Sequence, residues 1–157
     1  MSEESQALVA EVGRAMQAYQ RSTDAFDDAV AARLGLNRTD LRGLDWLFDG
    51  PLAVGELGAA TGLTSAATTA LIDRLEQKGF VARVRDAADR RKVLIEMTAQ
   101  GRQRVGAFYG PLVREGNQLL ARLCDKKLEI LRDHLVASRQ LTDRHCAGIR
   151  RLRGPIT

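Results

Sequence analysis

Basic side chains gather in one short stretch of the sequence, residues 80–92, and their type and spacing indicate binding to a polyanion. The stretch has a net charge of +3 from Arg83, Arg85, Asp86, Asp89, Arg90, Arg91 and Lys92. Guanidinium groups form paired hydrogen bonds with phosphates, and the narrow minor groove of DNA attracts arginine because negative potential is concentrated there. The chemistry predicted for this segment is therefore electrostatic recognition of nucleic acid.

The remaining charge divides unevenly along the chain, although the formal total is only +4. Residues 1–33 carry a net charge of −3, whereas residues 139–153 carry a net charge of +4. The total alone does not identify a partner, because net charge influences association only broadly. Two interpretations of the basic tail stay open: it contacts the acidic first segment in a dimer, or it is a solvated, frayed end.

Histidine and cysteine are the remaining residue types that could support catalysis or metal binding. His134 and His145 lie eleven residues apart, which does not match the spacing that places two ligands on one face of a helix. Cys124 lies among leucines, so we expect a buried, unreactive thiol rather than a redox sensor. The sequence has no Ser-His-Asp order and no glycine-rich phosphate loop. It therefore predicts no enzyme, no cofactor and no metal site.

Length and composition are typical of one globular domain. The chain has 157 residues, of which 45% are hydrophobic and 28% charged. Its two cysteines cannot form a disulfide framework, which favours a reducing compartment. No apolar run approaches the roughly eighteen residues that a membrane span needs. We therefore expect a cytoplasmic protein that does not contact a membrane.

Hydrophobic periodicity predicts a mainly α fold with a small β hairpin. Apolar residues recur at helical spacing, which predicts helices over 6–34, 37–48, 54–60, 65–78, 98–123 and 125–149. Residues 80–85 and 92–97 instead alternate apolar and polar side chains, as half-buried strands do. The polar residues 86–90 form the turn between these strands.

The order of these elements is that of a winged helix-turn-helix. The helices 54–60 and 65–78 are joined by the short turn Thr61-Gly62-Leu63. A helix fits the major groove of DNA, and a basic hairpin that follows it can reach the backbone and the adjacent minor groove. We therefore expect double-stranded DNA to be bound by a recognition helix, 65–78, and a wing, 80–97.

The wing also resembles that of the MarR family of transcriptional regulators. Asp89 and Arg91 fill the family's Asp-x-Arg signature, and Thr98 and Gly101 fill the helix start that follows it. Residues upstream resemble the family's helix-turn-helix in Val54-Gly55-Glu56-Leu57, Gly62-Leu63 and Leu71-Ile72-Asp73-Arg74-Leu75-Glu76. The resemblance covers residues 37–101 by motif, and the whole chain by element order and length.

The resemblance implies a single MarR-like domain over residues 1–157. Residues 37–101 would form the DNA-binding lobe, and the helices 6–34 and 102–150 the dimerisation lobe. It implies a homodimer whose two recognition helices, about 34–36 Å apart, read a pseudo-palindromic operator. It also implies repression of a nearby gene, which ends when a small, often aromatic effector binds between the lobes.

The outer face of the recognition helix carries few long polar side chains. Because Thr68, Leu71, Ile72 and Leu75 are expected in the core, the outward residues are Ser65, Ala66, Ala67, Thr69, Ala70 and Asp73. The hydroxyl groups of Ser65 and Thr69 can bond to bases or phosphates, whereas the alanines can contact thymine methyl groups. The family usually places longer polar or basic side chains here, so we expect modest direct readout and more reliance on DNA shape.

The wing is expected to contact DNA through its arginines. Arg90 and Arg91 lie at its tip, where one enters the minor groove while Asp89 braces the other. Arg83 and Arg85 share one face of a strand and are expected to meet phosphates.

The end of the recognition helix carries two further basic residues, Arg74 and Lys78, where phosphate contacts are expected. Arg74 has an alternative, which is an ion pair with Glu56 or Asp73. Asp73 could instead brace a wing arginine.

The effector site and the biological role leave alternatives open. Trp46, the only tryptophan, is expected either to pack in the core or to line a ligand site with Tyr19 or Tyr109. Two other roles compete with a ligand-responsive repressor. One is a winged-helix module that binds protein, and the other is an architectural DNA-binding protein without an effector.

Overall fold

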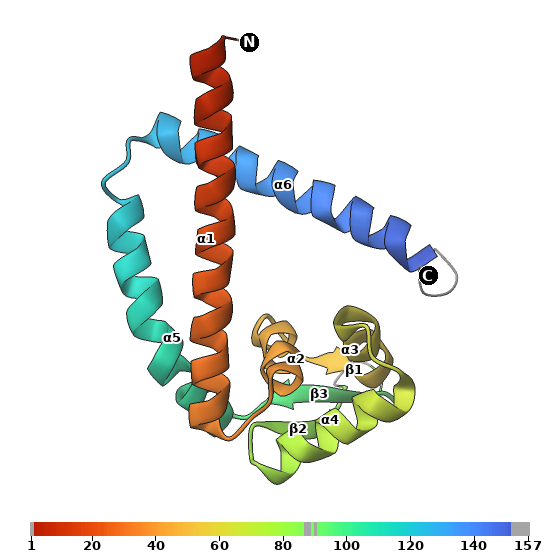
Figure 1. Cartoon of the computed structure of the whole chain (residues 1–157). Coiled ribbons are helices and arrows are strands. Elements are labelled where there is room, and N and C mark those ends of the chain that lie inside the picture. Colours follow the sequence, from red (N-terminus) through yellow and green to blue (C-terminus); the bar gives the residue numbers. More distant parts are fainter. Residues whose placement is uncertain (1, 87–88, 90, 152–157) are drawn as a thin grey trace. The chain divides into compact units, whose positions relative to one another are not determined.

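The computed structural model describes residues 2–86, 89 and 91–151 (Figure 1). The chain divides into two units, residues 1–109 and 110–157, and each is described by itself. The first unit contains the predicted winged helix-turn-helix and the first helix, α1. The second contains the end of helix α5 and all of helix α6.

Helix α1, Glu3–Leu34, begins three residues before the predicted start because Ser2 caps it. The Ser2 hydroxyl accepts a hydrogen bond from the Ser5 amide, and Gly35, with a φ of 67°, ends the helix in the left-handed region. Only Val30, Ala31 and Leu34 of this helix are buried. Its last two turns therefore pack on the core, while most of its apolar stripe faces solvent.

Three shorter helices follow, and two of them form the predicted helix-turn-helix. Helix α2, Arg38–Phe48, starts with a capping box between Asn37 and Asp40. Helix α3, Val54–Thr61, and helix α4, Ser65–Gln77, are joined through Gly62, whose φ is 73°. Thr64 caps α4 by accepting a hydrogen bond from the Ala67 amide. The predicted bounds of these helices differ from the observed ones by one or two residues at most.

The predicted hairpin is present, but it belongs to a sheet of three strands. Strands β2, Val81–Arg85, and β3, Val93–Met97, pair antiparallel with Arg83 opposite Ile95. A third strand, β1, Leu52–Ala53, pairs with the other edge of β3, so the sheet order is β1-β3-β2. The sequence did not reveal β1, because two residues are too few to show an alternating pattern.

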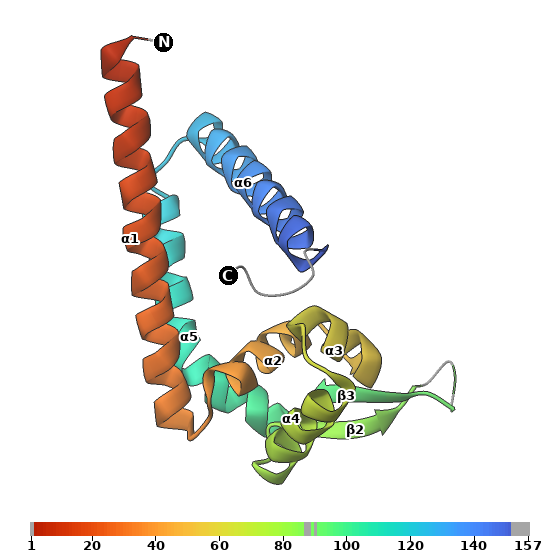
Figure 2. The ribbon, with the colours of Figure 1, turned by 45° about the vertical axis from the view of Figure 1, so that its right-hand side comes forward.

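The core of the first unit joins the sheet to the helices around it. Its most buried side chains are Leu44, Leu47, Leu57, Leu71, Ile72, Leu75, Phe80 and Ile95, each at most 1% exposed. They come from α2, α3, α4, the turn after α4, and β3. This single core holds the recognition helix and the wing in a defined relation (Figure 2).

Helix α5, Ala99–Leu120, starts against the base of the wing. The Thr98 hydroxyl donates to the Gly79 carbonyl oxygen and accepts from the Gly101 amide, at 2.7 and 2.9 Å. A Cβ atom on Gly101 would lie 2.3 Å from the carbonyl oxygen of Phe80, so only glycine fits there. The two residues of the family's helix start, Thr98 and Gly101, thus fix the first turn of α5 to the wing.

Helix α6, Asp125–Arg151, has no buried residue. Cys124 and Cys146 are exposed, so the expectation of a buried Cys124 is wrong. Leucine neighbours did not indicate burial here, because the apolar residues of α6 have no described part of the second unit covering them. In the described part of the chain, no helix combines the length and hydropathy needed to cross a membrane.

Candidate nucleic-acid interface

Helix α4 buries one face and presents the other to solvent, as the periodicity predicts. Thr68, Leu71, Ile72 and Leu75 are each at most 1% exposed. The outward residues Ser65, Ala66, Thr69, Ala70 and Asp73 are exposed, and Ala67 is half-buried. Their predicted contacts with DNA stay predictions, but the structure places them together on one accessible face.

The hydroxyl groups along α4 are largely engaged by the helix itself. Thr64 Oγ1 accepts from the Ala67 amide at 3.3 Å, and Thr68 Oγ1 donates to the Thr64 carbonyl oxygen at 2.9 Å. Thr69 Oγ1 donates to the Ser65 carbonyl oxygen at 3.1 Å. Across the described residues, no hydrogen bond engages the Ser65 side chain. Among the described residues, the hydroxyl protons of Ser65 and of the capping Thr64 are therefore the ones at the start of α4 that no hydrogen bond engages.

Arg74 is held by a buried carboxylate that the sequence did not point to. Its Nη2 and Nε atoms lie 2.7 and 3.3 Å from Oδ1 of Asp40, whose residue is 1% exposed. The other oxygen of Asp40 accepts from the Asn37 amide at 3.3 Å. The expected partners Glu56 and Asp73 are wrong, because Glu56 instead accepts from the backbone amide before α3.

The Arg74–Asp40 pair ties the recognition helix to the start of α2. The Arg74 side chain is 42% exposed, so part of its guanidinium group is accessible from outside. A phosphate contact by Arg74 stays a prediction. The other basic residue of this region, Lys78, donates from Nζ to the Gly35 carbonyl oxygen.

Arg83 links the wing to α4. Its Nη2 lies 2.6 Å from Asp73 Oδ1, and its Nη1 donates to Glu76 Oε2. The hydrogen bond to Asp73 is the largest cause that raises the pKa of Arg83, and the charge of Glu76 adds to it. Asp73 therefore braces Arg83 on strand β2. From the sequence, the expected partner of Asp73 was either Arg74 or an arginine at the tip of the wing. Arg83 has carboxylate partners already, so we interpret it first as a brace of the wing, and its phosphate contact stays a prediction.

Asp89 shapes the turn at the tip of the wing. Its Oδ1 accepts from the Arg91 backbone amide at 3.1 Å, and its carbonyl oxygen accepts from the Lys92 amide at 2.8 Å. The side chains of Arg85 and Arg91 are exposed, and none of the ion pairs among the described residues involves either of them. The expected contact of Arg90 lies outside the described residues. Two unpaired guanidinium groups thus accompany the braced Arg83.

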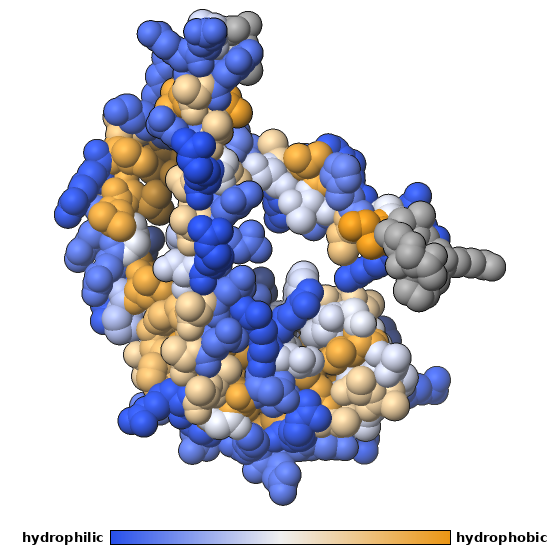
Figure 3. Space-filling view, viewed as in Figure 1, coloured by the Kyte–Doolittle hydropathy of each residue, from blue (hydrophilic) through white to orange (hydrophobic). Residues whose placement is uncertain are grey.

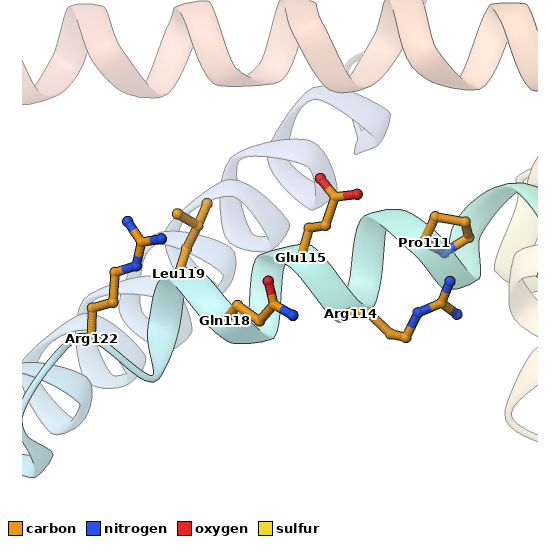
Figure 4. A pocket seen from close by; sticks show the side chains of 6 residues that line it. All are labelled: Pro111, Arg114, Glu115, Gln118, Leu119 and Arg122. Atoms are coloured by element: carbon orange, nitrogen blue, oxygen red, sulfur yellow. The ribbon is translucent and has the colours of Figure 1, made fainter.

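Two hollows lie on the described surface. One, of about 180 Å³, lies between α3 and the first turn of α4 and is lined by Val54, Gly55, Gly58, Ala59, Leu63, Ser65 and Thr68. Its lining has no charged side chain. The other, of about 550 Å³, is lined by six residues of α5 and the segment after it: Pro111, Arg114, Glu115, Gln118, Leu119 and Arg122 (Figure 4).

The residues considered for an effector site are only partly brought together. The Tyr109 ring packs edge-on against Phe26, with centroids 5.3 Å apart, and its hydroxyl donates to Asp27 Oδ1 at 2.6 Å. Burial, followed by the bond to Asp27, raises the pKa of Tyr109. Burial and the charges of Asp27 and Asp49 raise the pKa of Asp45.

Tyr19 and Trp46 lie outside this group. Tyr19 is 76% exposed, and Trp46 is 46% exposed, so the expectation that Trp46 packs in the core is wrong. Phe26 was visible in the sequence as part of the apolar stripe of α1, but nothing there connected it with Tyr109. Within residues 2–86, 89 and 91–151, no group of three histidine, cysteine, aspartate or glutamate side chains could hold a metal ion.

Comparisons with known proteins agree with this architecture. A family model described as the MarR family matches residues 34–92. The uncharacterized HTH-type transcriptional regulator YcgE of Bacillus subtilis (strain 168) is 39% identical over 110 residues, which cover 69% of this chain and 71% of that protein. The HTH-type transcriptional repressor YetL of the same organism is 36% identical over 77 residues, which cover 47% of this chain and 46% of that protein.

A solved structure leads to the same conclusion. The structure of a MarR family protein from Bacillus stearothermophilus matches with a TM-score of 0.63 and 25% identity, and the match covers 91% of this chain and 99% of that chain. The match extends over nearly the whole of both chains, so the likeness concerns the overall fold and is not limited to the helix-turn-helix motif. The chain belongs to the MarR family of winged helix-turn-helix, DNA-binding regulators of transcription.

Proposed function

We propose that this protein is a homodimeric repressor that binds a pseudo-palindromic operator through α4 and the wing, and that a small aromatic effector releases it. The observation that carries the proposal is the pair of exposed arginines, Arg85 and Arg91, on a hairpin that Arg83 ties to α4. An arginine on a fixed hairpin loses less conformational entropy on binding than one on a free loop. The wing is therefore preorganised to contact DNA while α4 lies in the major groove.

Homodimer formation is supported by apolar side chains that the described chain leaves uncovered (Figure 3). Those at least 40% exposed include Leu8, Val9, Val12 and Met16 of α1, Leu112, Val113, Leu119 and Leu120 of α5, and Ile130, Leu135, Val136 and Leu141 of α6. Soluble monomers rarely expose apolar patches of this extent, whereas association surfaces do. A second copy would supply the partner for each of these helices by symmetry.

Repression and release rest on narrower support. The relative YetL is named a transcriptional repressor, which favours repression rather than activation by this protein. The aromatic pair of Phe26 and Tyr109 joins α1 to α5, and Asp27 and Asp45 lie around it. An aromatic molecule that displaces the Tyr109 ring would change how α1 and α5 pack. We place the effector there rather than at the exposed Tyr19.

The test is a gel-shift titration of promoter DNA flanking the gene with wild-type protein and with Arg91→Ala. Loss of a minor-groove arginine should raise the Kd by about tenfold or more. Arg132→Ala is the matched control, since Arg132 is an exposed arginine of α6 that pairs only with its neighbour Asp133 among the described residues. Sedimentation should show the same dimer for all three proteins. An unchanged affinity of Arg91→Ala would contradict the role of the wing.

Random-sequence DNA at two salt concentrations separates the remaining alternatives. A specific repressor should bind promoter DNA more tightly than random DNA at both concentrations. Equal affinity for the two would favour an architectural protein. No binding to either DNA at low salt, where phosphate contacts are strongest, would favour a winged-helix module that binds protein.

A further inference from the structure

The exposed face of the first two turns of α4 is composed mainly of methyl groups. Ala66, Ala67 and Ala70 contribute only Cβ atoms, and none of them is fully buried. Thr69 is exposed, and because its hydroxyl donates to the Ser65 carbonyl oxygen, the Cγ2 methyl group is the unheld end of its side chain. The part of a recognition helix that reaches base edges is its N-terminal part, so this face is the one that meets them.

Polar groups that could read bases are engaged elsewhere or lie further along the helix. Arg74 is held by Asp40, and Asp73 and Glu76 are held by Arg83. Arginine, lysine, asparagine and glutamine are the side chains that read guanine and adenine in the major groove. None of these types occurs between Ser65 and Asp73. Direct readout by α4 therefore depends on apolar contact and on the Ser65 hydroxyl.

We infer that α4 selects thymine: Ala66, Thr69 and Ala70 are specificity-determining residues that contact thymine C5-methyl groups, and the half-sites under α4 are rich in A·T pairs. The inference rests on the proposed operator binding and specifies the bases that it prefers. The thymine methyl is the one apolar group that bases present in the major groove. Both kinds of base pair present polar groups in the major groove, but a G·C pair has no methyl group, so it offers the methyl groups of α4 no apolar partner.

The wing adds a preference of the same kind. The minor groove narrows over A-tracts, and the enhanced negative potential there attracts arginine. Arg85 and Arg91 are the exposed, unpaired arginines of the described wing. A·T pairs are thus favoured through methyl groups in the major groove and through groove width in the minor groove, and one substitution in the DNA can separate the two effects.

The experiment starts with selection of tight-binding sites from a random-sequence duplex library by the full-length protein. The best site is then synthesised with deoxyuridine in place of thymine, first under α4 and, as a control, only under the wing. Uracil pairs as thymine does and lacks only the methyl group. Removing one thymine methyl group that α4 touches should weaken binding about three- to fourfold, while replacement under the wing should change the Kd by much less.

Two substitutions at one position provide the matched protein test. Thr69→Val keeps a methyl group and removes the hydroxyl, whereas Thr69→Ser keeps the hydroxyl and removes the methyl. We expect Thr69→Val to bind the selected site like wild type and to lose affinity when thymine is replaced by deoxyuridine. Thr69→Ser should bind the thymine site more weakly and respond less to the same replacement.

The outcomes distinguish this inference from the proposed function. If selection enriches no site, specific operator binding fails and thymine selection fails with it. If a site is enriched but deoxyuridine under α4 leaves the Kd unchanged, or the bases under α4 are mainly G·C pairs, thymine selection is refuted while operator binding stands. If Thr69→Val loses affinity while Thr69→Ser, which keeps the hydroxyl, binds like wild type, the readout belongs to the hydroxyl and the contact of Thr69 with a thymine methyl group is refuted.

Discussion

Replacing Arg74 with alanine removes the guanidinium group that lies 2.7 Å from Asp40 Oδ1. The carboxylate left behind belongs to a residue that is only 1% exposed. Among the described residues, the Asn37 amide, 3.3 Å from Oδ2, is then the one hydrogen-bond donor that remains to it. The substitution therefore creates a buried charge with insufficient partners at the junction of α2 and α4.

The size of the effect follows from how much water can replace the guanidinium group. Removing one partner of a fully buried ion pair costs about 3–5 kcal/mol in the free energy of unfolding, whereas surface pairs contribute less than about 1 kcal/mol. Here the carboxylate is buried, but the Arg74 side chain is 42% exposed, so water can approach the vacated position. We expect a loss of about 2–3 kcal/mol, between these two limits.

A second substitution checks that the unpaired charge is the cause. Asp40→Asn replaces the carboxylate with an amide of the same shape, which is less costly to bury unpaired. Added to Arg74→Ala, it should restore part of the lost stability, so the double variant should be more stable than Arg74→Ala alone. Two independent effects would instead add up to a larger loss.

The measurement is urea unfolding followed by far-UV circular dichroism at one fixed protein concentration, because the proposed dimerisation would make the apparent stability depend on concentration. Each variant should keep the m-value of wild type and shift the midpoint. A loss below about 0.5 kcal/mol in Arg74→Ala would place the pair among ordinary surface pairs. A double variant less stable than Arg74→Ala would refute the explanation based on an uncompensated carboxylate.

Two further predictions concern α5. Gly101→Ala should strongly lower the melting temperature, because its Cβ atom would lie 2.3 Å from the Phe80 carbonyl oxygen. The matched control is Gly106→Ala, whose Cβ atom would have no atom within 4 Å, and its free energy of unfolding should rise by about 0.5–1 kcal/mol. Equal shifts of the two variants in thermal melts would contradict the close approach. Tyr109→Phe should abolish an alkaline loss of stability. Because burial and Asp27 raise the pKa of Tyr109 above its ordinary value of 10.0, the folded state holds this proton more tightly than the unfolded chain. The stability that the tighter proton binding contributes is complete below about pH 10 and decreases above it. Urea midpoints measured between pH 9 and about 11 should therefore fall more in wild type than in Tyr109→Phe. Parallel curves for the two proteins would contradict this role of Tyr109.

Local patterns were enough to predict the helices, the hairpin and the outward face of α4. Each of these depends on spacing within one segment, and the alternation at residues 80–85 and the glycines at 62 and 79 are short-range signals. The strand β1 escaped because it has only two residues and pairs with a strand more than forty residues later.

Partners and burial could not be predicted in the same way. Nothing in the sequence singled out Asp40, because only folding brings it to Arg74, which is 34 positions away. Burial could not be predicted for Cys124 and Trp46. Apolar neighbours indicate which face of a helix is apolar, but they do not show whether other parts of this chain cover that face. The charged face of the wing was correctly located, whereas the division between the bracing Arg83 and the exposed Arg85 and Arg91 needed the structure.

The close approach of Gly101 to Phe80 fixes the first turn of α5 to the residues that follow the recognition helix. Phe80 lies three residues after the end of α4. Arg104 of α5 adds a second contact, because its guanidinium group lies over the Phe80 ring and donates to the Lys78 carbonyl oxygen. Tyr109 lies two turns further along the same helix, where it packs on α1. Helix α5 is therefore attached at one point to the residues that follow the recognition helix and at another to α1, so the same helix connects these two parts of the first unit.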